Sequence, residues 1–153
     1  MRQAAKERTL RKDYSMTLPS LQRAAEITPS RSGFHVMAKP SGPACNLDCS
    51  YCFYLEKEAL FPGKNTRRMS DEVLEAYVRN TIASTPPDHP VAFTWQGGEP
   101  TLLGINFYRR ALALQQFYGR GRRIDNSFQT NGTLIDEEWA AFLAESGFLV
   151  GLS

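Results

Sequence analysis

The sequence of 153 residues predicts an α/β fold in which strands and helices alternate in the order β-α-β-α-β-α-β. Short apolar runs bounded by glycine or proline alternate along the chain with longer segments of helical periodicity. Such alternation requires helical crossovers, and strands joined by crossovers run parallel. In addition, a polar motif follows each apolar run. Together these observations predict a parallel sheet whose polar side chains gather at one edge.

The first part of this pattern contains one strand and one helix. Residues 34–39 (FHVMAK) form an apolar run that Pro40 stops, which predicts a short buried strand. Ser70 is expected to cap a helix whose first turn carries Asp71 and Glu72, a favourable placement for the helix dipole. Two consecutive prolines end this helix. Its apolar face is expected to consist of Val73, Leu74, Tyr77, Val78 and Ile82.

A second strand and a second helix follow. Residues 91–95 (VAFTW) are rich in strand-forming residues and lie between a proline and a glycine, so they predict the second strand. Residues 105–118 have helical periodicity, and Gly119 and Gly121 are expected to end that helix. Its apolar positions are Phe107, Tyr108, Ala111, Leu112 and Leu114.

The last part of the pattern contributes two strands and the helix between them. Residues 124–129 predict the third strand, and Asp136 is expected to cap the third helix, which Gly147 stops. Residues 148–153 (FLVGLS) predict a fourth strand, and its outer edge is expected to be unpaired. The apolar face of the third helix consists of Trp139, Phe142 and Leu143.

The three cysteines of the chain, Cys45, Cys49 and Cys52, follow the first strand in the stretch CNLDCSYCFY. A [4Fe–4S] cluster takes one thiolate per iron, so three thiolates would hold it and leave one iron open. Zinc is disfavoured because the only histidines, His35 and His89, are distant in sequence. An odd cysteine count without a secretory signal disfavours a disulfide and indicates the reducing cytoplasm. The polar neighbours indicate a loop, against a third alternative of three unrelated buried cysteines.

Composition limits the partners of the chain. A hydrophobic fraction of 42% is ordinary for a globular protein, and a net charge of +2 is too small to indicate nucleic-acid binding. No apolar run approaches the roughly 18 residues that span a bilayer, so no membrane partner is expected. Residues 1–32 are predicted to be a flexible basic extension with a short helix near residues 18–26, and residues 33–153 to be a partial core domain.

The polar motifs that follow the four strands are expected to lie side by side. CNLDCSYC follows the first strand, QGGEP (residues 96–100) the second and QTNG (residues 129–132) the third, and Ser153 ends the fourth. Parallel α/β folds bind ligands at the carboxyl ends of their strands. This edge is therefore the predicted functional site.

These residues carry a resemblance to the radical S-adenosylmethionine (SAM) superfamily, through C-x3-C-x2-C after the first strand and GGEP after the second. At a finer level, residues 34–153 resemble the N-terminal part of anaerobic sulfatase-maturating enzymes. The resemblance implies a partial (β/α)6 TIM-like barrel, of which this chain would be a truncated N-terminal portion. The stretches that carry it are HVMAKPSGPACNLDCSYCFYLEK, FTWQGGEPTLLG, SFQTNGTLIDEEWAAFL and FLVGLS.

The resemblance implies two bound cofactors, a [4Fe–4S] cluster and SAM. Cys45, Cys49 and Cys52 would hold the cluster, and the methionine part of SAM would chelate the open iron. An electron passed from the cluster would then cleave a carbon–sulfur bond of SAM and release an adenosyl radical. The residues implied to bind SAM are Tyr51, Gln96, Gly97, Gly98, Glu99 and Ser153.

Each of these residues has an implied place. Gly97 and Gly98 lack side chains, so backbone would approach the methionine ammonium closely, and Glu99 would add negative charge beside it. Tyr51 would contact adenine, and Gln96 would face the substrate pocket. The structural alternatives are an ordinary tight turn for GGEP and simple packing under the cluster for the tyrosine. The T-N-G stretch is also ordinary turn chemistry.

For function, the resemblance implies a radical SAM oxidoreductase that converts a cysteine or serine of an unfolded sulfatase polypeptide to Cα-formylglycine. The implied partners are that polypeptide and a reducing electron donor. Family members are more than twice as long and supply their catalytic base from a later part, so no catalytic residue is predicted in this chain. Two alternatives stay open: another radical SAM peptide-modifying enzyme, and an inactive fragment that only binds an iron–sulfur cluster.

Overall fold

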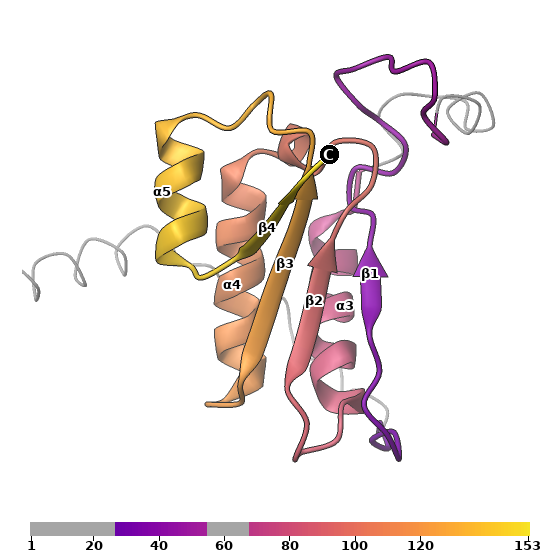
Figure 1. The fold of residues 1–153 in the computed structure, drawn as a ribbon. Coiled ribbons are helices and arrows are strands. Elements are labelled where there is room, and N and C mark those ends of the chain that lie inside the picture. Colours follow the sequence, from indigo (N-terminus) through magenta and orange to yellow (C-terminus); the bar gives the residue numbers. More distant parts are fainter. Residues whose placement is uncertain (1–26, 55–67) are drawn as a thin grey trace, which may run out of the picture.

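The computed structural model describes residues 27–54 and 68–153. Within them, four strands form one sheet in the order β1-β2-β3-β4, and each neighbouring pair is parallel (Figure 1). The predicted α/β architecture and strand direction are thus confirmed, whereas the helix predicted near residues 18–26 lies outside the described residues. The strands are β1 (Val36–Ala38), β2 (Val91–Trp95), β3 (Ile124–Thr130) and β4 (Leu149–Leu152).

The strand β1 is shorter and more exposed than predicted. It pairs with β2 through Val36, Met37 and Ala38 only. Val36 is 38% exposed and Met37 is 50% exposed, so the prediction of a buried strand is wrong for both. The reason is position in the sheet, because β1 pairs with β2 alone among the described strands. Composition could not reveal that position.

Two helices begin with the side-chain caps that the sequence predicts. Ser70 Oγ accepts a hydrogen bond from the backbone N–H of Val73 at 3.3 Å, and Asp136 Oδ1 accepts one from Trp139 N–H at 2.9 Å. Val73 itself is 52% exposed, contrary to the predicted apolar face, and Thr81 is buried on that face instead. The elements are α3 (Asp71–Ser84), α4 (Ile105–Gly119), α5 (Glu137–Glu145) and an unpredicted 3-10 helix, η2 (Pro100–Leu103).

The end of α4 differs in detail from the prediction. The first residue after the helix, Arg120, has a left-handed backbone conformation with φ of 43°, and Gly121 follows with φ of 85°. A left-handed residue commonly ends a helix, but glycine takes that conformation at lower cost than arginine. Gly119 and Gly121 therefore lie on either side of Arg120, and the arginine takes the first left-handed position after the helix.

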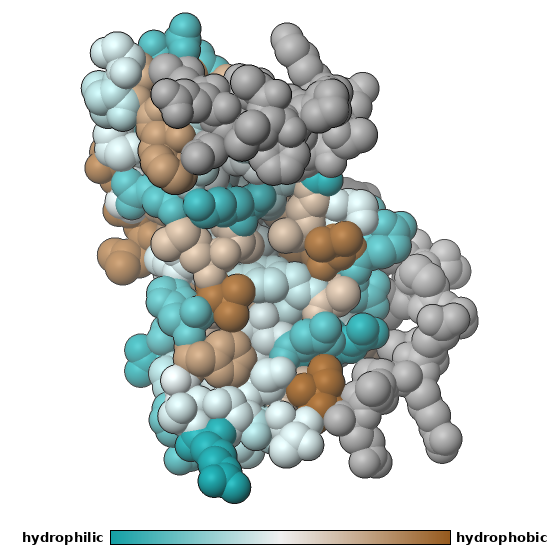
Figure 2. All heavy atoms as spheres, turned by 90° about the vertical axis from the view of Figure 1, so that its right-hand side faces the viewer, coloured by the Kyte–Doolittle hydropathy of each residue, from teal (hydrophilic) through white to brown (hydrophobic). Residues whose placement is uncertain are grey.

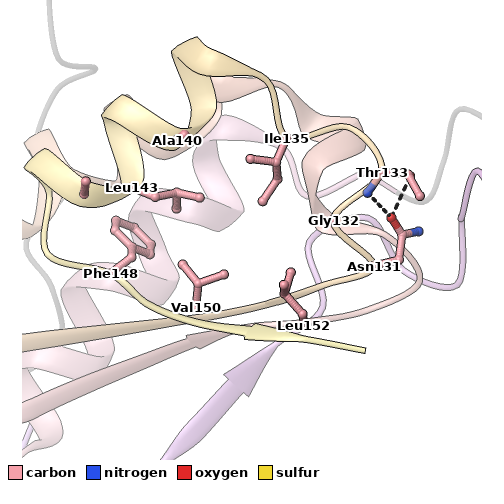
Figure 3. A pocket seen from close by; sticks show the side chains of 10 residues that line it. Asn131, Gly132, Thr133, Ile135, Ala140, Leu143, Phe148, Val150 and Leu152 are labelled. Atoms are coloured by element: carbon pink, nitrogen blue, oxygen red, sulfur yellow. Dashed lines mark hydrogen bonds between the residues drawn. The ribbon is translucent and has the colours of Figure 1, made fainter.

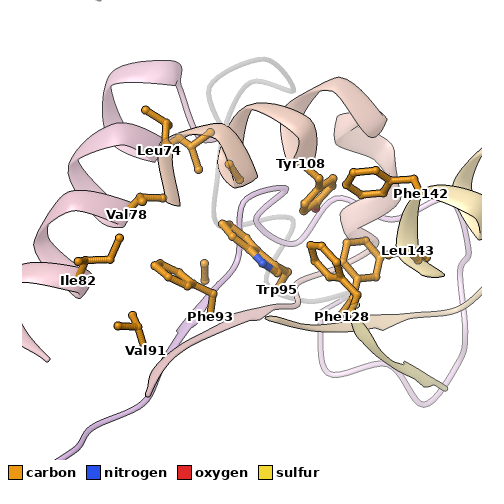
Figure 4. Packing of buried hydrophobic residues seen from close by; sticks show 14 of the residues in the cluster. Leu74, Val78, Ile82, Val91, Phe93, Trp95, Tyr108, Phe128, Phe142 and Leu143 are labelled. Atoms are coloured by element: carbon orange, nitrogen blue, oxygen red, sulfur yellow. The ribbon is translucent and has the colours of Figure 1, made fainter. Parts of the chain in front are cut away.

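The helices pack against one face of the sheet and enclose the apolar core (Figure 4). Alternate residues of β2, namely Val91, Phe93 and Trp95, are fully buried on this face. The Trp95 ring makes edge contacts with Tyr77 of α3 at 5.6 Å and with Tyr108 of α4 at 5.7 Å between ring centroids. Full burial of one large apolar side chain stabilises the fold by roughly 1.5–3 kcal/mol. This core fixes β2 and β3 beneath the loops described below.

The opposite face of the sheet carries polar side chains in register. Thr94 of β2 lies opposite Ser127 of β3, and their hydroxyl groups are 2.7 Å apart in a hydrogen bond. His35, just before β1, contacts the same threonine. Because side chains alternate along a strand, Gln96 follows Thr94 on this face, one step nearer the carboxyl edge. Polar side chains thus extend along β2 to the predicted site, and the exposed apolar side chains of Met37 and Leu149 lie on the same face.

The surface on the β1 side shows hydrophobic side chains as separate spots among hydrophilic ones (Figure 2). The more exposed hydrophobic residues include Tyr51 and Phe53, both of which follow the second cysteine. Across residues 27–54 and 68–153, no helix is long and apolar enough to cross a bilayer.

Candidate functional site

The carboxyl ends of the strands bring four segments to one edge of the sheet (Figure 1). We refer to residues 40–54 as the cysteine loop, to residues 96–99 as the glycine loop and to residues 131–136 as the asparagine loop. Ser153 follows β4 at the same edge, where its backbone N–H donates to Thr130 O at 3.1 Å. The predicted gathering of the polar motifs is confirmed.

The cysteine loop carries three half-buried thiols that form no disulfide. The backbone N–H of Cys52 donates to Cys49 O at 2.8 Å and closes a tight turn between them. The sulfur of Cys45 accepts a hydrogen bond from Leu47 N–H, and that of Cys52 accepts one from Tyr54 N–H, each at 3.4 Å. Donors aimed at sulfur favour a ligating thiolate, since a charged acceptor forms the stronger hydrogen bond. The loop is therefore suited to metal ligation.

Two of the three cysteines border a cavity. Its volume is about 320 Å³, and Cys45 and Cys52 line it, whereas Cys49 does not. Among the described residues, no group of three His, Cys, Asp or Glu side chains is placed to hold a single metal ion. A [4Fe–4S] cluster takes one thiolate per iron, so three cysteines on one loop match its ligand set with one iron left open. The cavity is lined by Pro43, Cys45, Asn46, Leu47, Asp48, Cys52 and Tyr54.

A larger pocket, of about 710 Å³, lies on the helix side of the sheet between α5 and β4 (Figure 3). Apolar side chains line most of it, including Leu143 of α5 and Val150 and Leu152 of β4. It contains no cysteine and no residue of the glycine loop. Because β4 pairs with β3 alone among the described strands, its apolar side chains remain uncovered, as the predicted unpaired edge implies. Asn131 and Thr133 of the asparagine loop line this pocket, whereas Cys45 and Cys52 line the smaller cavity.

The glycine loop lies directly against the backbone of the cysteine loop. A Cβ atom on Gly98 would lie 2.1 Å from Ala44 O, and one on Gly97 would lie 2.9 Å from Gly42 O. The backbone N–H of Gly98 donates to Gly42 O, and that of Glu99 donates to Ala44 O, both at 2.8 Å. The glycines are thus required for contact between two loops. The close approach of these glycines to SAM stays a prediction.

Glu99 is fully buried, and its carboxylate connects three segments of the edge. Oε1 accepts hydrogen bonds from the backbone and the hydroxyl of Thr101 and from the hydroxyl of Thr130, and Oε2 accepts one from Asn131 N–H at 2.8 Å. Burial, and secondarily the charge of Glu99, raises the pKa of the Tyr108 phenol, which donates to a backbone carbonyl of η2. The carboxylate therefore holds the glycine and asparagine loops together.

The sequence reasoning missed a closed ring of hydrogen bonds between the cysteine and asparagine loops. Asn46 Nδ2 donates to Thr133 Oγ1 at 2.8 Å, and that hydroxyl donates to Asn131 Oδ1 at 2.7 Å. Asn131 Nδ2 completes the ring by donating to Asn46 Oδ1 at 2.9 Å, and it also lies 3.7 Å from Cys45 Sγ. The sequence offered one indication of this ring. An asparagine follows the first cysteine, and another lies in the T-N-G stretch, which is predicted to reach the same edge of the sheet.

The remaining residues predicted to contact SAM lie at this edge, and their side chains differ in solvent exposure. Tyr51 is 88% exposed, so its ring does not pack under the loop as the structural alternative required. Gln96 is half-buried, and its backbone N–H donates to Ala38 O at 2.9 Å. The hydroxyl of Ser153 lies 3.4 Å from Thr130 O. These three residues stay predicted SAM contacts.

Fold and site together define a class: a parallel α/β protein with a three-thiol loop at the carboxyl edge of its sheet, suited to an iron–sulfur cluster and a second ligand on its open iron. The chain belongs to the radical SAM superfamily, whose family model matches residues 40–153. The matched region begins at the cysteine loop and includes all four segments of the edge.

The similar proteins include both the serine type and the cysteine type of anaerobic sulfatase-maturating enzyme. The chain is 46% identical to a serine-type anaerobic sulfatase-maturating enzyme of Bacteroides thetaiotaomicron over 86% of this chain and 31% of that protein. It is 45% identical to a cysteine-type enzyme of Clostridium perfringens over 77% of this chain and 32% of that protein. The chain thus spans about a third of the length of these relatives.

The fold is also similar to solved structures. Native anSMEcpe with bound AdoMet and Kp18Cys peptide matches with a TM-score of 0.67 and 44% identity, over 77% of this chain and 31% of that chain. Native anSMEcpe with bound AdoMet alone matches with a TM-score of 0.66.

Proposed function

We propose that this chain supplies the cluster-binding and SAM-binding segment of a radical SAM enzyme of the anaerobic sulfatase-maturating type. The observation that carries the proposal is the meeting of three unbridged cysteines with the glycine loop and the asparagine loop at one edge of a parallel sheet. Members of the radical SAM superfamily use a [4Fe–4S] cluster and SAM. The similarity to both serine-type and cysteine-type enzymes supports the finer assignment.

In this proposal Cys45, Cys49 and Cys52 each give one thiolate to the cluster, which leaves one iron for SAM. When bound, the cluster and SAM supply a one-electron cleavage that generates a radical able to remove hydrogen from a carbon atom. The exposed Tyr51 ring has a free face for adenine. Ser153 and the glycine-loop residues 96–98 offer polar groups to the rest of SAM.

Glu99 has a different proposed role from its neighbours. Its carboxylate is fully buried and accepts hydrogen bonds from Thr101, Thr130 and Asn131. This geometry supports a positioning role, in which Glu99 fixes the glycine loop that touches SAM, more than the direct contact with the ammonium group that the sequence predicted. A buried carboxylate that accepts four hydrogen bonds is stabilised in this position, and moving it toward a ligand would break those bonds.

We propose that the substrate is a sulfatase polypeptide segment whose cysteine or serine becomes Cα-formylglycine. Hydrogen removal at Cβ, followed by loss of a proton and transfer of a second electron to an acceptor such as an iron–sulfur cluster, would oxidise a serine to the aldehyde. A cysteine would give a thioaldehyde, which water would convert to the aldehyde with release of hydrogen sulfide. A separate reducing donor must supply the electron that starts the reaction. The three free thiols support a reducing compartment, the cytoplasm. The division into an N-terminal extension, residues 1–32, and a core domain, residues 33–153, is part of the same proposal.

The test is anaerobic incubation of the iron-loaded protein with dithionite, SAM and a sulfatase-derived peptide. We expect 5′-deoxyadenosine that carries deuterium when the peptide is deuterated at Cβ of its cysteine or serine, since hydrogen removal needs the adenosyl radical and not the catalytic base of the later part. Formation of 5′-deoxyadenosine without deuterium would contradict the sulfatase substrate and favour another peptide-modifying reaction. Iron loading without 5′-deoxyadenosine would show that the chain by itself only binds a cluster.

A further inference from the structure

The ring formed by Asn46, Thr133 and Asn131 has a consequence for the first cysteine. The ring joins the cysteine loop to the asparagine loop through side chains alone. Its member Asn131 also directs Nδ2 toward Cys45 Sγ at 3.7 Å, within hydrogen-bonding reach of a sulfur acceptor. Cys45 therefore receives two donors, one from the backbone of Leu47 and one from a side chain of a different loop.

The orientation of the Asn131 amide is fixed by its partners. Asn131 Oδ1 accepts hydrogen bonds from the backbone N–H of Thr133 at 3.0 Å and from its hydroxyl at 2.7 Å. A backbone N–H can only donate, so the oxygen must face Thr133 and the nitrogen must face Cys45. The backbone of Asn131 is held in turn by the buried carboxylate of Glu99 at 2.8 Å. Both ends of the residue are thus restrained.

We propose that Asn131 is a positioning residue for the cluster, which donates a hydrogen bond to the Cys45 thiolate and thereby raises the reduction potential of the cluster. The inference rests on the proposed cluster site. Reduction adds negative charge that the sulfur ligands share, so a donor to sulfur stabilises the reduced form more than the oxidised form. Partners beyond the ligands commonly tune a metal site in this way.

Ligation changes the neighbourhood of Cys45 in a direction that favours this role. As a free thiol, Cys45 lies 3.9 Å from Asn46 Oδ1, to which it can donate a weak hydrogen bond. A thiolate has no proton to donate, so that contact is lost on ligation. The contacts from Leu47 N–H and Asn131 Nδ2 strengthen instead, because their acceptor becomes charged.

The test is a redox titration of the reconstituted chain, followed by electron paramagnetic resonance, with iron and sulfide measured in parallel. We expect Asn131→Ala to lower the ratio of reduced to oxidised cluster about tenfold at a fixed potential, which corresponds to about 59 mV for a one-electron couple. Asn131→Asp removes the same donor and adds negative charge, so its potential should fall further. Thr133→Val opens the ring but keeps the donor, and it should change the potential less than either.

Asn80→Ala is the matched control, because this asparagine is exposed on α3 and its side-chain oxygen accepts a hydrogen bond from the neighbouring Arg79. It should leave both iron content and potential unchanged. Equal potentials in all variants that load iron would overturn the inference. Loss of iron from every Asn131 variant would also overturn it, since the residue would then only hold the loop. Failure of the unmodified chain to bind iron would contradict the proposed function itself, a distinct result.

Discussion

The contact between the glycine loop and the cysteine loop predicts a large effect for Gly98→Ala. The new Cβ would lie 2.1 Å from Ala44 O and 2.5 Å from Pro43 O, and both are backbone atoms that cannot rotate away. The loops must separate, which weakens the hydrogen bonds from Gly98 N–H to Gly42 O and from Glu99 N–H to Ala44 O. Overpacking costs about 1–3 kcal/mol, and each hydrogen bond contributes about 0.5–1.5 kcal/mol.

The free energy of unfolding should therefore fall by about 2–6 kcal/mol, measured by urea denaturation. Gly151→Ala is a control with nearly the same overlap, because its Cβ would lie 2.3 Å from Gln129 Oε1. That atom ends a flexible side chain, so one rotation relieves the overlap, and the cost should stay below about 1 kcal/mol. Equal losses in both variants would refute the argument that backbone contact is the reason for Gly98.

The remaining predictions concern single side chains. Glu99→Gln places an amide group among the donors, including Asn131 N–H, and should cost about 2–4 kcal/mol in urea unfolding; a neutral result would show that the buried charge is dispensable. Ser70→Ala removes a helix cap and should cost about 1 kcal/mol. Hydrogen bonds from the Ser70 hydroxyl and from the backbone N–H of Glu72 lower the pKa of the Glu72 carboxyl. This carboxylate therefore stabilises the fold above its ordinary pKa of about 4.3, and the stabilisation is lost as pH falls below that value. An unchanged loss of stability at acid pH in Ser70→Ala would disprove the assignment. Burial raises the pKa of the Tyr77 phenol, so stability should fall as pH rises above about 10, and Tyr77→Phe should reduce this slope in alkaline urea titrations; identical slopes would count against it.

The fold was predictable where the decisive information is local. The stretch VAFTW carries its own strand propensity and its own boundaries, and β2 begins and ends at those residues. Ser70 and Asp136 are followed by helical periodicity, and both cap their helices. In contrast, the exposure of β1 depends on its place at one end of the strand order, which no local pattern specifies.

The site was predictable as a set of motifs but not as a set of contacts. The cysteine spacing and the strand ends indicated which residues meet at the edge. They did not indicate that Gly98 touches Ala44, because that distance depends on how β1 and β2 pair. The Asn46–Thr133 hydrogen bond depends likewise on the register of three strands. A carboxylate such as Glu99 looks exposed in sequence, and only three-dimensional packing reveals that it is buried.

The most direct test of the central claim is the iron and sulfide content of the chain after anaerobic reconstitution, compared with variants in which Cys45, Cys49 or Cys52 is replaced by alanine. We expect about four irons and four sulfides per chain in the unmodified protein. Each single variant should lose most of this iron, with unfolding by urea little changed in the metal-free proteins. Absence of iron from the unmodified chain, or full loading after removal of a cysteine, would contradict the assignment of the cysteine loop as the cluster site.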